Sequence, residues 1–62
     1  MYKKYEYLRD SQKLTNYQVS KLLNIPYSTL SEWKNGKYTP KLDKIKKIAE
    51  YFGVDINYFL ED

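Results

Sequence analysis

Cysteine and histidine are both absent from this chain of 62 residues. Their absence excludes disulfide bonds, thiolate or imidazole metal sites, and any catalysis that depends on either side chain. Apolar runs reach only two or three residues, so neither a membrane span nor a signal peptide is predicted. A chain of this length forms one domain at most, near the lower size limit for a hydrophobic core without covalent or metal support.

Glycine is scarce as well, since Gly36 and Gly53 are the only two. A glycine-rich phosphate loop is therefore excluded. The acidic residues are scattered singly among lysines, which is typical of a solvated surface and not of paired carboxylates in acid–base catalysis. We expect no enzyme activity, no cofactor, no metal site and no small-molecule substrate.

The charge that is present is unevenly distributed. Residues 1–53 hold eleven Lys or Arg and five acidic residues, whereas Asp55, Glu61 and Asp62 bring three negative charges to the last nine positions. A basic body of this kind suits a polyanion, through phosphate neutralisation and counterion release. A lysine-rich surface that only keeps a small domain soluble is the alternative, and charge alone does not separate the two.

Tyrosine is abundant, with eight copies. A stacking platform for single-stranded nucleic acid is one interpretation. The tyrosines are spread over every predicted helix, however, which favours residues at the rim of a core whose hydroxyls reach water.

Residues 15–36 predict two short helices joined by a tight corner. Thr15 followed three positions later by Gln18 is a capping-box pattern for a helix start. Asn24 tolerates the left-handed conformation that a sharp corner requires, and Pro26 suits the first position of the next helix. Helix, corner and helix together form the outline of a helix-turn-helix.

The second helix of this pair has two chemically different sides. At 100° per residue, Leu30 and Trp33 fall within about 60° of each other and mark the side that faces a core. The opposite side carries short polar groups, with Tyr27 at its edge: Ser28, Ser31, Glu32 and Asn35. Short hydrogen-bonding side chains allow a helix to come close to another polar surface.

Three further helices complete the prediction. Residues 2–13 form the first, and residues 54–60 form a short last one, started by an Asp55 cap. The fourth is expected to begin with Thr39 as cap and Pro40 as first residue, and to stop at Gly53. The residues predicted to face the core from these three helices are Tyr5, Leu8, Gln12, Leu42, Ile45, Ile48, Ala49, Phe52, Ile56, Phe59 and Leu60. The expected fold class is all-α, a compact five-helix domain over residues 1–62 with the helix-turn-helix at about 15–36.

The run from Leu14 to Leu60 resembles the lambda-repressor and Cro family of bacterial and phage DNA-binding domains, often called the XRE family. The matching features are Ser20, the turn at Asn24-Ile25, Ser28-Thr29-Leu30, Trp33, Asn35-Gly36-Lys37, Pro40 and a close of the form Ile-Ala-x-x-Phe-Gly-Val, with Tyr5, Leu8 and Arg9 in the first helix. The resemblance implies sequence-specific binding of double-stranded DNA by a transcriptional regulator, such as a phage or prophage repressor or a Cro-like protein.

The resemblance also implies roles for particular positions. The early outward residues of the third helix read base edges in the major groove in this family. Here they are Tyr27, Ser28, Ser31 and Glu32, which we call the base-reading face. Contacts to the phosphate backbone are implied at the start of the second helix and after the third, at Asn16, Asn35, Lys37, Tyr38 and Lys41.

Three positions depart from the family pattern. Asn24 replaces the usual glycine at the turn. Lys34 replaces a common glutamate that pairs with an arginine of the first helix, so Arg9 needs another partner, such as a phosphate. Glu32 replaces a frequently basic or amide residue; it can accept a hydrogen bond from cytosine N4, or it can pair with a neighbouring lysine.

One small domain offers few contacts, so tight binding is expected to need two copies on a pseudo-palindromic operator. A homodimer contact is expected near Ile56, Tyr58 and Leu60, and the setting is the bacterial cytosol or nucleoid. Both a complete regulator and the amino-terminal domain of a longer repressor fit this interpretation. The alternative function is a protein-binding module, antitoxin-like or adaptor, with its interface centred on Tyr27 and Trp33.

Overall fold

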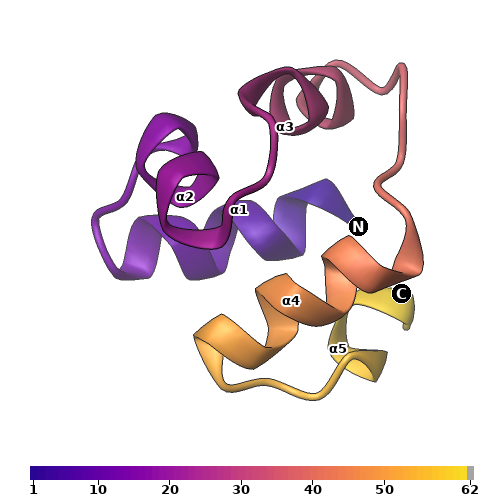
Figure 1. The fold of residues 1–62 in the computed structure, drawn as a ribbon. Helices are drawn as coiled ribbons and strands as arrows, with labels where there is room; N and C mark the ends of the chain where they lie inside the picture. The colour runs from indigo at the N-terminus through magenta and orange to yellow at the C-terminus, as the bar shows by residue number, and fades with distance from the viewer. Residues whose placement is uncertain (62) are drawn as a thin grey trace.

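The computed structural model describes residues 1–61, which fold into five α-helices without a strand in that range. They are α1 (Tyr2–Ser11), α2 (Asn16–Leu23), α3 (Tyr27–Lys34), α4 (Leu42–Phe52) and α5 (Asn57–Leu60). In Figure 1, α2 and α3 form the upper part of the molecule and α4 and α5 the lower part, with α1 running between them. α2 packs against both α3 and α4, and α1 packs against α5. The predicted five-helix, all-α architecture is confirmed.

One hydrophobic core joins all five helices. It consists of Tyr5, Val19, Ile25, Leu30, Trp33, Ile45, Ile48, Ala49 and Phe59. Aromatic contacts are central to it: the Tyr5 ring stacks on Trp33 with centroids 5.1 Å apart, and Tyr2 meets Trp33 edge-on at 5.3 Å. Each such pair adds about 0.5–1.5 kcal/mol to the burial itself. The position of α3 is thus fixed from α1 through the Trp33 ring.

The helix-turn-helix has the local structure that its sequence predicts. The Gln18 N–H donates to Thr15 Oγ1 (3.1 Å) and the Thr15 N–H donates to Gln18 Oε1 (2.8 Å), which completes the capping box at the start of α2. Asn24 ends α2 in the left-handed conformation, with φ 55° and ψ 45°. The Ile25 N–H then closes the corner on the Ser20 carbonyl at 3.1 Å. The predicted capping box at Thr15 and the predicted left-handed Asn24 are confirmed.

The start of α4 differs from the prediction. Thr39 and Pro40 lie in extended chain, and the helix begins only at Leu42, with Lys41 as the residue before it (ψ 161°). Pro40 is buried and serves packing instead of the first helical turn. Leu42 was predicted to be buried, but it is 61% exposed. Its direction lies about 70° from the mean of the four inner residues of α4, at the edge of the apolar stripe.

Other helix ends are also corrected. Ser11 ends α1 two residues early, which leaves Gln12 exposed outside it. Pro26 precedes α3 in an extended conformation (ψ 134°) and is not its first helical residue. Asp55 Oδ1 accepts the Asn57 N–H at 2.8 Å, as a cap would, although Ile56 stands between it and α5.

α5 is a single turn that buries Phe59 but leaves Leu60 50% exposed, contrary to the prediction. Adjacent residues in a helix point about 100° apart, so Leu60 is turned away from the core that Phe59 enters. Lys4 of α1 secures its end: the Lys4 ammonium donates to the Tyr58 carbonyl at 2.8 Å and to the Glu61 carbonyl, and it lies 5.3 Å from the Tyr58 ring centroid. The first and last helices are therefore joined directly.

Candidate nucleic-acid interface

α3 separates its apolar and polar sides as the periodicity predicts. Leu30 and Trp33 are 0% and 4% exposed, so this side belongs to the core. The predicted base-reading face lies on the other side: Tyr27 is 54% exposed, Ser28 and Glu32 are exposed, and Ser31 is partly exposed. The structure therefore brings all four predicted base-reading residues to one accessible helix surface.

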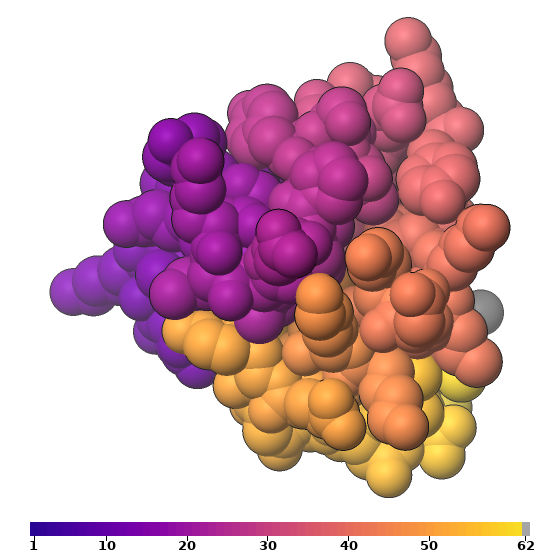
Figure 2. All heavy atoms as spheres, viewed as in Figure 1, coloured from indigo at the N-terminus to yellow at the C-terminus, as the bar shows by residue number. Residues whose placement is uncertain are grey.

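The loop after α3 begins with a closed helix end. The Gly36 N–H donates to the Trp33 carbonyl (3.1 Å) and the Lys37 N–H to the Glu32 carbonyl (2.9 Å), and Gly36 adopts the positive φ of 74° that this closure needs. Figure 2 shows this loop, residues 35–41, next to α3 at the upper right of the view. Asn35, Lys37 and Tyr38 are all exposed on it.

Two hollows flank the start of α3. The first, about 350 Å³, lies at the corner and is lined by Tyr17, Ser20, Lys21, Asn24, Ile25, Pro26 and Tyr27. The second is lined by Pro26, Thr29, Tyr38, Lys41, Asp43 and Lys44. The second hollow unites two predicted phosphate-contacting residues, Tyr38 and Lys41, and adds Lys44; Asn16, Asn35 and Lys37 are not among its lining residues.

The sequence predicted no role for Tyr17, Lys21 and Lys44, which line these two hollows. The Lys21 ammonium lies 5.3 Å from the centroid of the exposed Tyr17 ring, so an aromatic ring and a cation stand together at the outer edge of α2. The four-residue spacing of Tyr17 and Lys21 was the available signal. Their place beside Tyr27 depends on the corner between the helices.

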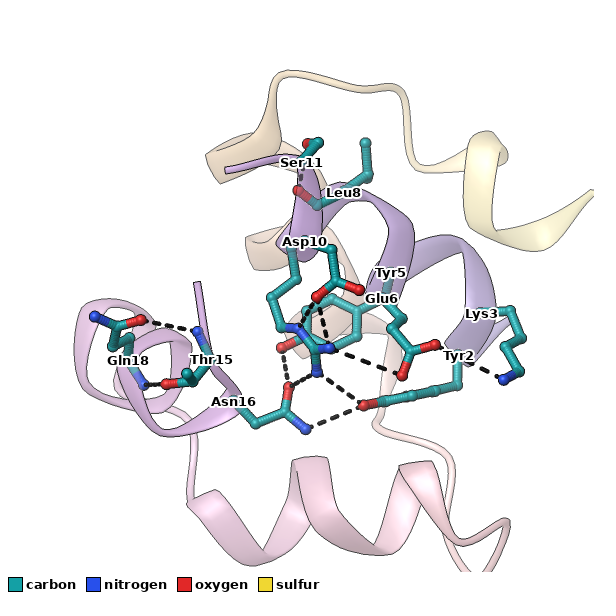
Figure 3. Close-up of polar contacts among 11 residues, drawn as sticks. Tyr2, Lys3, Tyr5, Glu6, Leu8, Asp10, Ser11, Thr15, Asn16 and Gln18 are labelled. Atoms are coloured by element: carbon teal, nitrogen blue, oxygen red, sulfur yellow. Dashed lines mark hydrogen bonds and ion pairs between the residues drawn. The ribbon is translucent and has the colours of Figure 1, made fainter. Parts of the chain in front are cut away.

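Asn16 has a different environment from the other predicted phosphate contacts (Figure 3). Its side-chain Oδ1 accepts hydrogen bonds from the Tyr5 hydroxyl (2.6 Å) and from Arg9 Nη1 (3.0 Å), and its Nδ2 donates to the Tyr2 hydroxyl (3.1 Å). Asn16 is partly buried. The amide therefore connects the start of α2 to α1, and its contact with a phosphate stays a prediction.

Arg9 finds its partners inside the protein. Its Nε and Nη2 donate to Asp10 Oδ1 at 3.0 and 2.7 Å, its Nη2 lies 3.8 Å from Glu6 Oε2, and its Nη1 also donates to the Tyr2 hydroxyl at 3.2 Å. The suggestion that a phosphate replaces the missing glutamate partner is therefore not needed. Acids of α1 itself, Glu6 and Asp10, take that place.

Tyr5 is the buried member of this polar cluster. Burial raises the pKa of the Tyr5 hydroxyl well above its usual range, although the nearby Arg9 charge acts in the opposite direction. The hydroxyl therefore keeps its proton and donates it to Asn16 Oδ1. The orientation of the Asn16 amide follows from this donation.

The structure bears on three alternatives that the sequence left open. Glu32 was expected to be able to pair with a neighbouring lysine, but within residues 1–61 it forms no ion pair. The protein interface expected around Tyr27 and Trp33 is corrected at Trp33, which is buried, whereas Tyr27 is exposed. The exposed tyrosines are distributed over four helices and a loop, which favours separate residues at the rim of the core over a single stacking platform; they are Tyr7, Tyr17, Tyr27, Tyr38 and Tyr51.

Comparison with known proteins agrees with this geometry. The family model described as helix-turn-helix matches residues 6–59. This chain belongs to the lambda-repressor and Cro type of helix-turn-helix family. Its members are all-α DNA-binding domains of transcription regulators.

Two helix-turn-helix relatives are similar over most of this chain. The HTH-type transcriptional activator BcrR of Enterococcus faecalis is 32% identical over 57 residues, which are 92% of this chain and 28% of the activator. An uncharacterised HTH-type transcriptional regulator of Methanocaldococcus jannaschii is 38% identical over 56 residues, 90% of this chain and 85% of that protein. This helix-turn-helix chain thus spans less than a third of the first relative. No solved structure matches it significantly. None of the helices within residues 1–61 has the length and apolar character to cross a membrane.

Proposed function

We propose that this helix-turn-helix domain binds double-stranded DNA sequence-specifically and regulates transcription, as a phage or prophage repressor or a Cro-like regulator does. The observation that carries the proposal is the division of α3. Its inner side is fixed by Leu30 and Trp33 in the core, and its outer side presents short polar groups to solvent. A helix of this kind can enter a major groove without moving. Catalysis has no part in the proposal.

The base-reading face supplies distinct hydrogen-bonding groups. The hydroxyls of Ser28 and Ser31 donate and accept, and the carboxylate of Glu32 only accepts, which suits the N4 amino group of cytosine. The absence of an ion pair at Glu32 within the described residues 1–61 leaves its oxygens available for such a contact. The Tyr27 ring adds an apolar surface at the edge of the face.

The phosphate contacts are proposed at both ends of this surface. Asn16 lies at the start of α2, and Asn35, Lys37, Tyr38 and Lys41 lie in the loop after α3 and at the start of α4. Lys44 joins them through the second hollow. Contacts of this kind set the position of the protein on the duplex and do not depend on base sequence.

Two copies on a pseudo-palindromic operator would supply the affinity that one small domain lacks. The exposed Leu60, with Ile56 and Tyr58 beside it only partly buried, is the proposed contact between copies. The cytosol or nucleoid of a bacterium is the proposed setting.

A protein-binding module, antitoxin-like or adaptor, is the second candidate. It is favoured by three large exposed side chains on α2 and α3, namely Tyr17, Leu22 and Tyr27. Selection of bound duplexes from a random DNA pool decides between the two, because a recovered inverted repeat would support both the operator and its symmetry.

Salt dependence of the same binding is the second measurement. Three of the proposed phosphate contacts carry a positive charge, namely Lys37, Lys41 and Lys44, so log K should fall with log[salt] with a slope of about −3. No enrichment of any duplex, together with salt-insensitive binding of a protein partner, would favour the second candidate.

A further inference from the structure

We propose that the Tyr2 hydroxyl is a further phosphate-contacting group of this domain and that Arg9 is the residue that positions it. This inference rests on the DNA-binding function proposed above. Tyr2 is partly exposed at the start of α1, and its ring lies edge-on against Trp33 at 5.3 Å. The ring is thus fixed by the core while the hydroxyl lies beside Asn16, at the start of α2.

The hydrogen bonds around the Tyr2 hydroxyl leave it as a donor. Its oxygen accepts from Arg9 Nη1 (3.2 Å) and from Asn16 Nδ2 (3.1 Å), so both lone pairs are occupied (Figure 3). Over residues 1–61, no protein acceptor receives its proton. The O–H therefore remains available to an acceptor from outside these residues.

The Asn16 amide provides a second donor beside the first. Its Oδ1 accepts from both Tyr5 and Arg9, which fixes the oxygen toward α1 and the nitrogen toward Tyr2. One Nδ2 hydrogen goes to Tyr2, and an amide nitrogen carries two. An O–H and an N–H on atoms 3.1 Å apart, both without a local acceptor among the described residues, fit an oxygen anion such as a phosphate.

Arg9 acts through Tyr2 and not on the phosphate itself. Its N–H groups are taken by Asp10, Tyr2 and Asn16, and Glu6 lies 3.8 Å away. Donation from a guanidinium polarises the Tyr2 hydroxyl and makes it a stronger donor. Lys3 and Arg9 together balance Glu6 and Asp10, so the contact adds a hydrogen bond without adding net positive charge.

Because this contact adds no net positive charge, its loss should affect DNA binding differently from the loss of a lysine contact. Tyr2→Phe should weaken every duplex alike, by about 10-fold for a hydrogen bond to a charged acceptor, and should leave the salt slope unchanged. Lys37→Ala, in contrast, should reduce that slope by about 1. Tyr7→Phe is the matched control, since Tyr7 is also on α1 but is 70% exposed and should bind as the wild type does.

The deciding experiment uses the duplex recovered by selection, with single phosphates replaced in turn by neutral methylphosphonates. At one position the replacement should cost the wild type about 10-fold more than it costs Tyr2→Phe, with Tyr7→Phe matching the wild type. A loss in Tyr2→Phe that is equal on every modified duplex would overturn the proposal, because the hydroxyl would then only support the fold. Equal binding by Tyr2→Phe and Tyr7→Phe would overturn it too.

A measurement on the wild-type chain covers the case in which Tyr2→Phe does not fold. With ¹³C at the phenol carbon of tyrosine, the Tyr2 signal should shift when the duplex is added and stay in place with the methylphosphonate duplex. An unchanged signal on both duplexes, with binding intact, contradicts the Tyr2 contact alone. Failure of the wild type to bind any duplex would overturn the DNA-binding function and this inference with it.

Discussion

The two sides of α3 differ in what determines their position. On the inner side, the Trp33 ring contacts Tyr2 and Tyr5 and is almost completely buried. On the outer side, Ser28 and Glu32 are exposed and form no side-chain hydrogen bond or ion pair within residues 1–61. The position of the outer face is therefore determined by the buried contacts on the inner side of α3. Its residues can change with little effect on the fold, and the residues behind it cannot.

Trp33→Ala is the most direct way to break this comparison. Truncation of a buried aromatic side chain costs about 3–5 kcal/mol, which is comparable with the whole stability of a domain of this size, roughly 3–9 kcal/mol. We expect a chain that is largely unfolded at room temperature, measured by circular dichroism during thermal unfolding. Tyr27→Ala, an exposed aromatic residue on the same helix, is the control and should melt within a few degrees of the wild type. Similar melting of both variants would mean that α3 is not held through Trp33.

Ser28→Ala and Glu32→Ala test the outer side. Each should keep the melting temperature and change the preferred base at one operator position by about 1–3 kcal/mol. Selection from a random DNA pool measures the new preference. Lys37→Ala is the contrasting variant and should weaken all sequences alike. A change of base preference in Lys37→Ala, with none in the two α3 variants, would reverse the roles assigned here.

Alkaline pH tests the inner side of α3 through Tyr5, whose ring stacks on Trp33. Burial raises the pKa of Tyr5 in the folded state above the value of about 10 that it has in an unfolded chain. The unfolded state therefore loses this proton first, and the stabilisation is complete below pH 10 and declines as the pH rises above it. One pH unit higher, the loss should be about 1 kcal/mol.

The melting temperature between pH 8 and 11 gives this loss, with Tyr5→Phe as control. All other groups are common to the two proteins, so the difference between the two curves carries the Tyr5 contribution. Parallel curves would show that Tyr5 ionises as easily in the folded protein as in the unfolded chain.

Substitutions of Asn24, the corner residue before α3, should have the smallest effect on stability. Its φ of 55° is adopted freely by glycine, at small cost by asparagine, and at higher cost by alanine. From most to least stable, we expect Asn24→Gly, then the wild type, then Asn24→Ala, with a total spread of about 1 kcal/mol in the free energy of unfolding. Urea unfolding measures it. Equal free energies of unfolding for Asn24→Ala and Asn24→Gly would show that the backbone at this position is not strained.

Local features of the fold could be predicted from the sequence. The capping box at Thr15, the left-handed Asn24 and the stop at Gly53 each depend on a few neighbouring residues, and all three are confirmed. The two sides of α3 follow from helical periodicity alone. The resemblance to the lambda-repressor family added the DNA-binding function and the roles of particular positions, and the family match agrees with the resemblance.

Features that depend on contacts between distant residues could not be predicted. The burial of Pro40 and the exposure of Leu42 depend on how the loop enters α4. The inward use of Asn16 depends on α1 lying against the start of α2, where Tyr2 and Arg9 reach it. Helical periodicity predicts on which side of α3 the base-reading face lies. The contacts of this face with DNA stay predictions, because they depend on a partner outside the chain.

The bond between Lys4 and the Tyr58 carbonyl spans 54 positions of the chain. Closing a loop of that length costs entropy that is recovered only when the intervening helices are ordered. The capping box and the corner, in contrast, close over three to five residues. During folding, the helix-turn-helix should therefore form early and the junction of α1 with α5 late, and amide hydrogens at that junction should exchange first when the native protein opens.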